Sequence, residues 1–140
     1  MKFSLIMATL GRFDDVRAFC EVLAAQTYRD FELIVIDQND GDGLSAILAP
    51  FATLFALVHI RSGKKGLSLN RNIGLQRATG DIIAFPDDDC LYNADTLEFV
   101  ARRMQEEKAD YFCVNWHDAT KPAAYQCVPE EPAEIKRQNF

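Results

Sequence analysis

The sequence has no apolar run that approaches the roughly 20 residues needed to cross a bilayer, so no transmembrane segment is expected. It also has no excess of positive charge. Its 15 Lys and Arg residues are outnumbered by 21 Asp and Glu residues, which gives a net charge of −6. An acidic chain is a poor partner for nucleic acid or for an anionic membrane surface. The apolar stretch after Lys2 is cut off at once by Gly11 and Arg12, so we interpret it as a first strand rather than an export signal.

Cysteine is scarce and widely spaced. Four cysteines occur, with no C-x-x-C pair, at Cys20, Cys90, Cys113 and Cys127. This spacing disfavours a zinc site and a disulfide framework, and it fits reduced thiols in a cytosolic protein. The glycine-rich phosphate-binding patterns G-x-x-x-x-G-K-[ST] and G-x-G-x-x-G are absent as well. Their absence excludes the usual nucleotide-triphosphatase and dinucleotide-binding proteins.

The chain has 140 residues, of which 49% are hydrophobic, and this is enough for one domain with a proper core. The hydrophobic residues occur in short apolar segments. Five segments are predicted as strands: residues 4–8, 32–37, 57–60, 81–85 and 111–115. The segments 34–36 and 82–85 are continuously apolar rather than alternating. Continuous runs are typical of strands that are buried on both faces, as in a parallel sheet.

Helical patterns separate these strands. Apolar residues recur at i, i+3, i+4 and i+7 from Val16, from Leu44 and from Leu97, and Pro50 should kink or end the second of these helices. Residues 67–78 form a further expected helix between glycines. Alternating strands and helices predict an α/β fold with a doubly wound, mostly parallel sheet, in which ligands bind beyond the carboxyl ends of the strands. We expect residues 1–118 to form this domain and residues 119–140, which hold three of the five prolines, to form a tail.

Three consecutive carboxylates follow the fourth predicted strand, in the segment Phe-Pro-Asp-Asp-Asp at residues 85–89. Adjacent like charges raise the free energy of each ionised group, and a divalent cation removes that repulsion. Mg²⁺ and Mn²⁺ prefer such oxygen ligands. If the backbone stays extended, Asp87 and Asp89 point one way and Asp88 the other. The alternative is a solvated acidic turn.

Other polar residues are expected at the same edge of the sheet. Asp37 ends the second strand, where a carboxylate can accept a hydrogen bond from a nucleobase or ribose, or can form an Asx turn. Arg71 and Arg12 can contact phosphate or hold an acidic loop, although each can equally be an exposed arginine. His59, on the third strand, is most simply a partly buried packing residue.

Taken in order, these segments resemble the N-terminal part of a family 2 glycosyltransferase with the GT-A fold. The resemblance rests on the first strand and its polar loop, on residues 26–37, on the block from Gly66 to Gly80 that contains Arg71 and Asn72, on residues 85–89 in the place of an Asp-x-Asp motif, and on residues 93–104. It covers the chain from Ser4 to about Met104. Proline, an aromatic residue and asparagine are common in the family's first loop and are lacking here.

The resemblance implies an inverting enzyme that transfers a sugar from a nucleotide-diphosphate sugar, commonly a UDP-sugar, to a hydroxyl of a saccharide or lipid-linked acceptor. It implies Mn²⁺ or Mg²⁺ as cofactor and a role in surface polysaccharide synthesis, in the cytoplasm or at the inner face of the membrane, with peripheral membrane or partner-chain association. The nucleotide sugar would be bound by Thr9, Arg12, Asp37, Arg71, Asp87 and Asp88. The metal would be bound by Asp89 and Asp87.

The family's domain usually extends well beyond 140 residues, and its second half carries the acceptor site and an acidic general base. The tail at residues 119–140 would be the start of that half. Asp118 and Glu130 are available as bases, but the spacing selects neither. A non-catalytic nucleotide-sugar-binding or regulatory domain of the same fold is therefore the main alternative. A phosphoacceptor signalling domain is disfavoured, because it needs an acidic pair directly after the first strand.

Overall fold

A computed structural model describes residues 1–114 of the chain. Residues 1–103 form one compact unit, which contains every residue of the site discussed below, and residues 104–140 are grouped as a second. The elements are β1 (Phe3–Thr9), α1 (Phe13–Ala24), β2 (Phe31–Asp37), α2 (Gly43–Leu48), the 3₁₀ helix η1 (Ala49–Thr53), β3 (Ala56–Arg61), α3 (Leu67–Leu75), β4 (Ile82–Ala84) and α4 (Thr96–Glu107). None of the helices in the described part of the chain is long and apolar enough to span a membrane.

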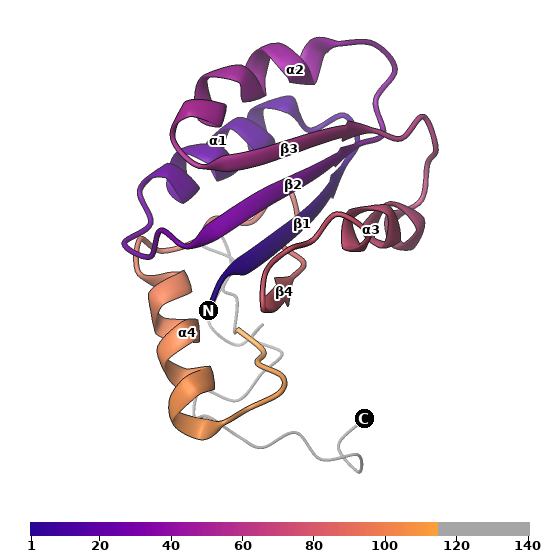
Figure 1. Ribbon diagram of the computed structural model, residues 1–140. Coiled ribbons are helices and arrows are strands. Elements are labelled where there is room, and N and C mark those ends of the chain that lie inside the picture. The colour runs from indigo at the N-terminus through magenta and orange to yellow at the C-terminus, as the bar shows by residue number, and fades with distance from the viewer. Residues whose placement is uncertain (115–140) are drawn as a thin grey trace, which may run out of the picture. The chain divides into compact units, whose positions relative to one another are not determined.

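The four strands form one parallel sheet in the order β3-β2-β1-β4 (Figure 1). Every neighbouring pair is parallel, as the continuous apolar runs predicted. The register places Ser4 opposite both Glu32 and Ile83, and it places Thr9 opposite Asp37 at the other end of the strands. The central strands β1 and β2 therefore end level with each other.

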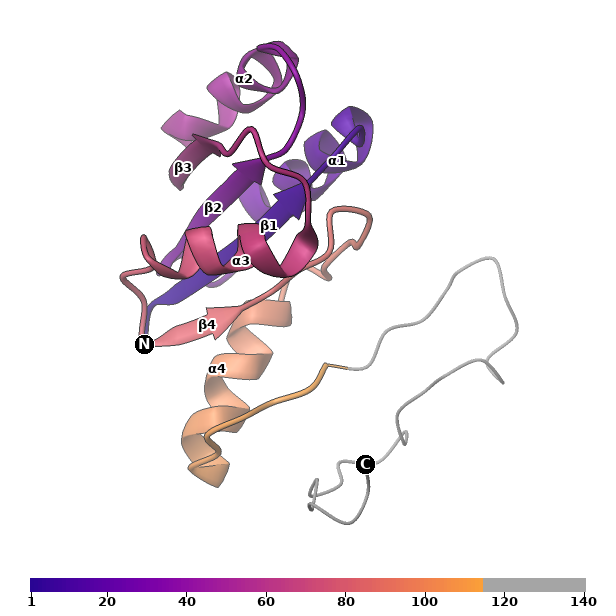
Figure 2. The same ribbon diagram turned by 90° about the vertical axis from the view of Figure 1, so that its right-hand side faces the viewer.

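Helices cover both faces of this sheet. Helices α1 and α2 lie on one face and α3 lies on the other, as Figures 1 and 2 show. The two central strands are consequently almost entirely buried. Helix α3 comes very close to the sheet at Gly74, where an added Cβ would lie 2.3 Å from Cγ2 of Ile6. Only glycine allows this separation, so Gly74 fixes how closely α3 sits against β1 and β2.

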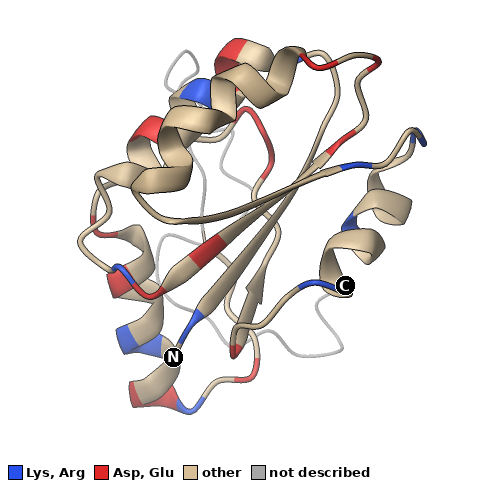
Figure 3. Cartoon of the chain, turned by 45° about the horizontal axis from the view of Figure 1, so that its top comes forward, with Lys and Arg blue, Asp and Glu red and all other residues tan. Residues whose placement is uncertain are grey.

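Charged residues lie mainly on helices and loops, while the strands are nearly free of them (Figure 3). Apart from Asp37 and Arg61 at the strand ends, the exception is Glu32 on the central strand β2. Its carboxylate accepts hydrogen bonds from Ser4 Oγ at 2.6 Å and from the backbone N–H of Thr79 at 2.8 Å, and Lys2 Nζ lies at 3.1 Å. Although burial alone would raise the pKa of Glu32, these hydrogen bonds lower it to about 2. The network attaches the connection between α3 and β4 to the amino edge of the sheet.

Two predictions about element boundaries have clear outcomes. Helix α2 ends at Leu48 and continues only as the 3₁₀ helix that contains Pro50, as predicted. The fifth strand is wrong for residues 111–114, which have no regular structure. Tyr111 and Val114 are 66% and 51% exposed, so this segment buries too little apolar surface to favour a strand. Asn115, Asp118, Glu130 and the expected tail at residues 119–140 lie outside the described residues.

Candidate functional site

The carboxyl ends of the parallel strands bring polar residues together at one edge of the sheet. Strand β1 ends at Thr9, β2 at Asp37 and β3 at Arg61, and the register places these three residues side by side. Ligands of open parallel α/β sheets bind at this edge. The residues proposed from the sequence as nucleotide-sugar or metal ligands lie at this edge, in the loops beside it or, for Arg71, in the middle of α3.

The carboxylates of residues 87–89 are each close to an arginine side chain. Nη2 of Arg71 donates a hydrogen bond to Asp87 Oδ1 at 2.8 Å. Nη1 of Arg12 lies 3.2 Å from Asp89 Oδ2, and Nε of Arg12 lies 3.6 Å from Asp88 Oδ1. The repulsion among the three acids is thus relieved by two guanidinium groups from distant parts of the chain. The segment is an acidic turn, but its carboxylates are paired rather than simply solvated.

The segment does not stay extended, so the alternation expected of an extended backbone does not apply. Strand β4 ends at Ala84, and a turn follows at Asp88 and Asp89, where the N–H of Cys90 is directed at Asp87 O at 3.3 Å. As a result, Asp88 and Asp89 share Arg12, while Asp87 contacts a different arginine. The Asp88 side chain is 15% exposed, compared with 62% for Asp87 and 48% for Asp89.

Arg71 is held in place between an acid and an aromatic ring. Its guanidinium carbon lies 5.4 Å from the ring centroid of Phe85, and its side chain is 26% exposed. Its Nε is buried and has no hydrogen-bond partner among the described residues. Arg71 is therefore not the freely exposed helix arginine of the alternative interpretation. A buried N–H without a partner is costly, and it can be satisfied by an anionic ligand.

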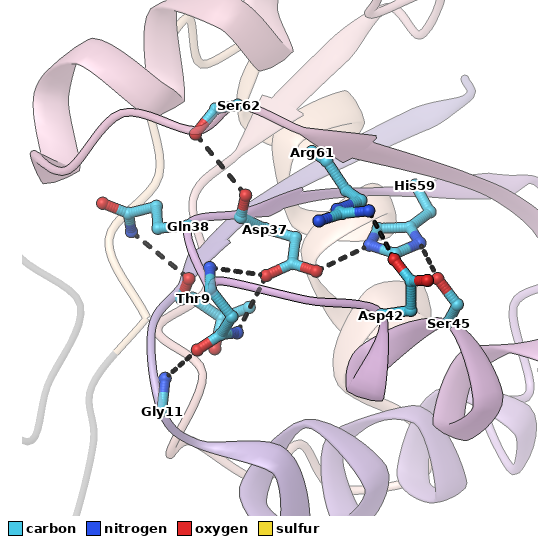
Figure 4. A network of polar contacts seen from close by, with 10 residues as sticks. Thr9, Gly11, Asp37, Gln38, Asp42, Ser45, His59, Arg61 and Ser62 are labelled. Carbon is cyan, nitrogen blue, oxygen red and sulfur yellow. Dashed lines mark hydrogen bonds and ion pairs between the residues drawn. The ribbon is translucent and has the colours of Figure 1, made fainter.

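Asp37 is completely buried, and both of its carboxylate oxygens have partners (Figure 4). Oδ1 accepts hydrogen bonds from the backbone N–H and from Nδ2 of Asn39, both at 2.8 Å. The first of these hydrogen bonds closes an Asx turn, which was one of the two possibilities that the sequence offered for Asp37. Oδ2 lies 3.0 Å from Nε2 of His59. The interpretation of His59 as a packing residue was thus incomplete, because its ring reaches the end of the neighbouring strand.

A second polar chain links β1 to the start of α3. The backbone N–H of Gln38 donates to Thr9 O at 3.0 Å, and the N–H of Gly66 donates to Gln38 Oε1 at 2.8 Å. Nδ2 of the buried Asn70 donates to the carbonyls of Lys64 and Gly66. Thr9 Oγ1 and Asn70 Oδ1 are buried without partners among the described residues. This edge of the sheet therefore holds unused hydrogen-bonding capacity.

The acidic turn suits a divalent cation in its chemistry. It offers only carboxylate oxygens, which hard cations prefer, and the exposed side chains of Asp87 and Asp89 can be reached from solvent. No group of three or more His, Cys, Asp or Glu side chains surrounds a common point within residues 1–114. The residues present therefore fit an ion that is bound by one or two carboxylates and completed by ligand oxygens, as is usual for Mg²⁺ with phosphates.

The sequence did not single out Gln38, Asn39, Asn70 or the role of His59. Gln38 and Asn39 could have been found from the sequence, because they directly follow Asp37 in a turn-rich segment. The contact of His59 depends on the pairing of β2 with β3, which no local pattern reveals.

Known proteins resemble this chain over most of its length. Residues 4–124 match the sequence pattern of the glycosyl transferase family 2. A cholesterol galactosyltransferase of Borreliella burgdorferi is 28% identical over 117 residues, which is 83% of this chain and 33% of that protein. The chain thus spans about a third of the length of that relative.

Solved structures resemble the chain as well. A fragment of S. aureus TarS, residues 1–349, in complex with UDP-GlcNAc gives a TM-score of 0.69 at 28% identity, covering 79% of this chain and 33% of that one. The mannosyltransferase PcManGT of Pyrobaculum calidifontis, solved with GDP-Man and Mn²⁺, gives a TM-score of 0.68 at 23% identity, covering 74% and 32%. The parallel sheet with helices on both faces is the expected GT-A arrangement, and the chain belongs to glycosyl transferase family 2.

Proposed function

We propose that the chain forms the nucleotide-sugar-binding part of an inverting glycosyltransferase, which passes a sugar from a UDP-sugar to an acceptor hydroxyl in the synthesis of a surface polysaccharide. The observation that carries this proposal is the pairing of Arg12 and Arg71 with the three carboxylates at the strand-end edge. A diphosphate with a divalent cation offers new partners to both kinds of side chain. The arginines can bind its anionic oxygens in place of the carboxylates, and the carboxylates can bind the cation in place of the arginines.

Each residue has a role in this proposal. Thr9 and Asp37 lie at the ends of the central strands and would face the base. Arg12 and Arg71 would contact the diphosphate, and Asp87 and Asp88 would hold the ribose or the donor sugar. Support comes from the 28% identity to TarS, which has been solved with UDP-GlcNAc.

Asp89, together with Asp87, would hold Mn²⁺ or Mg²⁺. When bound, the ion supplies positive charge that stabilises the leaving diphosphate. The arginines act in the same direction, because a guanidinium released from a carboxylate can donate two hydrogen bonds to a phosphate.

Binding measurements test this proposal. We expect UDP and UDP-sugars to bind in calorimetric titrations, more tightly with Mn²⁺ than without it. The variant Asp89→Asn should lose most of the Mn²⁺-dependent gain, about tenfold in Kd, because a charged ligand of the ion is removed. Asp30→Asn is the matched control, since Asp30 is an exposed acid at the opposite end of the sheet. Failure of UDP, GDP, CDP and ADP to bind, with or without the ion, would contradict the proposal.

Turnover separates the enzyme from a binding domain of the same fold. Release of UDP from a UDP-sugar in the presence of a saccharide or lipid-linked acceptor would support transfer. Binding without release by the full natural protein would favour the regulatory alternative. We place the protein in the cytoplasm or peripherally at the inner membrane face, where fractionation of cells should find it.

A further inference from the structure

The side chains of Asp37 and His59 form a buried link between strands β2 and β3 (Figure 4). Asp37 is fully buried, and the His59 side chain is 17% exposed. An ionised carboxylate can only accept hydrogen bonds, so the contact of 3.0 Å requires a proton on Nε2 of His59. In the neutral ring, Nδ1 is then an acceptor, and the Ser45 hydroxyl on α2 lies 3.5 Å from it. The ring is thus oriented from both of its nitrogens.

This link continues to the loop that follows β1. Asn39 donates twice to Asp37 Oδ1, and Asn39 Oδ1 accepts a hydrogen bond from the backbone N–H of Gly11 at 2.6 Å. Gly11 precedes Arg12, whose guanidinium contacts the acidic turn. The imidazole therefore lies at one end of a continuous path from β3 through β2 to the loop after β1.

We propose that His59 is a positioning residue for recognition of the nucleotide base. Its Nε2–H fixes the Asp37 carboxylate, and through Asn39 it also fixes the loop at Gly11. This inference rests on the proposed function, because it assigns to His59 the selectivity of that same site. Without the donor, one oxygen of a buried carboxylate would lose its partner, which is costly and favours a rearrangement of the carboxylate and of Asn39.

The flanking charged groups leave this assignment intact. Arg61, two residues along β3, is paired with Asp42 at the start of α2, so neither competes for Asp37 in the structure. A serine, a histidine and an aspartate that contact one another in this order also occur in the active sites of hydrolases. Here the Ser45 Oγ to Nδ1 separation of 3.5 Å is longer than the usual contact of a nucleophile with its base, so we assign Ser45 no catalytic role.

The test compares two substitutions of His59 that differ in one hydrogen-bond donor. His59→Leu introduces an apolar side chain of similar length that has no hydrogen-bond donor, whereas His59→Gln retains an N–H donor at a comparable position. Val58→Thr is the control, because Val58 neighbours His59 on β3 and its side chain is exposed rather than buried with Asp37. Kd is measured for UDP, GDP, CDP and ADP with Mn²⁺, and thermal melting verifies that each variant is folded.

We expect His59→Leu to weaken binding of the preferred nucleotide about tenfold and to reduce its preference over the other three bases. His59→Gln should restore both properties to within about threefold. In the background Asp37→Asn, His59→Leu should cause little further loss, because the two residues act as one unit.

Two measurements keep the outcomes distinct. If the unaltered chain binds a nucleotide and folded His59→Leu shows the same Kd and base preference, this inference is overturned while the proposed function stands. If the unaltered chain binds none of the four nucleotides, the proposed function fails and the inference with it. Should His59→Leu not fold, ¹⁵N chemical shifts of the imidazole in the unaltered chain decide: the Nε2–H tautomer supports the inference, and the Nδ1–H tautomer refutes it.

Discussion

Arg12 and Asp89 join the loop after β1 to the loop after β4, with Nη1 and Oδ2 3.2 Å apart. The same guanidinium lies 3.6 Å from Asp88 and 3.5 Å from Asp15. The single positive charge of Arg12 therefore lies close to three carboxylates, two of which belong to the proposed metal and nucleotide site. A divalent ion that binds the acidic turn must compete with this arginine.

Removal of the Arg12 charge should consequently strengthen binding of a metal ion and weaken binding of a diphosphate. In Arg12→Gln we expect the Kd for Mn²⁺ alone to fall about threefold, a modest effect because these side chains are half exposed and screened. The Kd for UDP with Mn²⁺ should rise about tenfold, because a charged donor to phosphate is lost. Electron paramagnetic resonance of free Mn²⁺ measures the first effect and calorimetry the second.

Arg17→Gln is the control for this experiment. Arg17 lies on α1 and lines a hollow against α2, next to Ala46 and Pro50. The Arg17→Gln substitution removes the same charge as Arg12→Gln, from a residue within α1 that forms no ion pair with the acidic turn in the described part of the chain. An equal change in Mn²⁺ affinity in both variants would show that net charge, rather than the Arg12 contact, controls the ion.

Gly74 allows the tight packing of α3 against the sheet. In Gly74→Ala the new methyl group would lie 2.3 Å from Cγ2 of the fully buried Ile6, so the helix or that side chain must move. We expect a loss of about 2 kcal/mol in the free energy of unfolding, despite the better helix propensity of alanine. Urea unfolding measures this loss.

The second variant for this contact is Ile6→Ala, which removes the clashing methyl group and leaves a cavity. Alone it should cost about 3 kcal/mol. Combined with Gly74→Ala, the loss should be clearly smaller than the sum of the two single losses, because the alanine methyl group occupies part of the space. Strict additivity would show that the two residues are not in contact.

Much of this arrangement could be predicted from the sequence, for a definite reason. The continuous apolar run at residues 34–36 is a local signal of a strand covered on both faces, and parallel strands place their carboxyl ends together. That is why Asp37 and the acids at residues 87–89 were expected at one edge. The end of helix α2 close to Pro50 could likewise be predicted, because proline disrupts a helix locally. Burial on both faces was wrong for residues 82–85, because β4 lies at the edge of the described sheet and Ile83 is 38% exposed.

The partners of these residues could not be predicted, because they depend on register and tertiary packing. Whether Asp88 points away from Asp89 or shares Arg12 with it depends on a turn that begins after β4 has ended. The contact of His59 with Asp37 depends on which strands pair. The fifth strand failed for the related reason that an apolar run forms a strand only where it can bury a face.

The pKa of the Cys90 thiol depends in part on the negative charge of the acidic turn. Burial, and then the carboxylates of Asp87 and Asp89, raise the pKa of Cys90. In Asp87→Asn one of these charges is removed, so the pKa of Cys90 should fall and more thiolate should be present at a fixed pH. We expect iodoacetamide to alkylate Cys90 about twofold faster in this variant. The exposed Cys113 serves as the internal reference, and an unchanged ratio of the two rates would contradict the prediction.

Glu32 should make the stability of the domain depend on pH in the acid range. Its pKa is about 2 in the folded chain, compared with the ordinary value of 4.5. A carboxyl whose pKa is lower in the folded state stabilises the fold above its unfolded pKa, and this stabilisation is lost as the pH falls from 4.5 toward 2. The shift corresponds to about 3 kcal/mol, and we expect about 2 kcal/mol because the Lys2 side chain is 32% exposed and its charge is screened by solvent.

Glu32→Gln should therefore lower the free energy of unfolding by about 2 kcal/mol near neutral pH, and its difference from the unaltered chain should shrink in acid. Glu21→Gln, on the exposed side of α1, controls for the loss of one negative charge. Urea unfolding at about pH 7, 4.5 and 3 provides the comparison. If the Glu32→Gln difference stayed constant over this range, the carboxylate would contribute through the shape of its side chain alone, and the hydrogen bonds from Ser4, Thr79 and Lys2 would not be the source of stability at the amino edge.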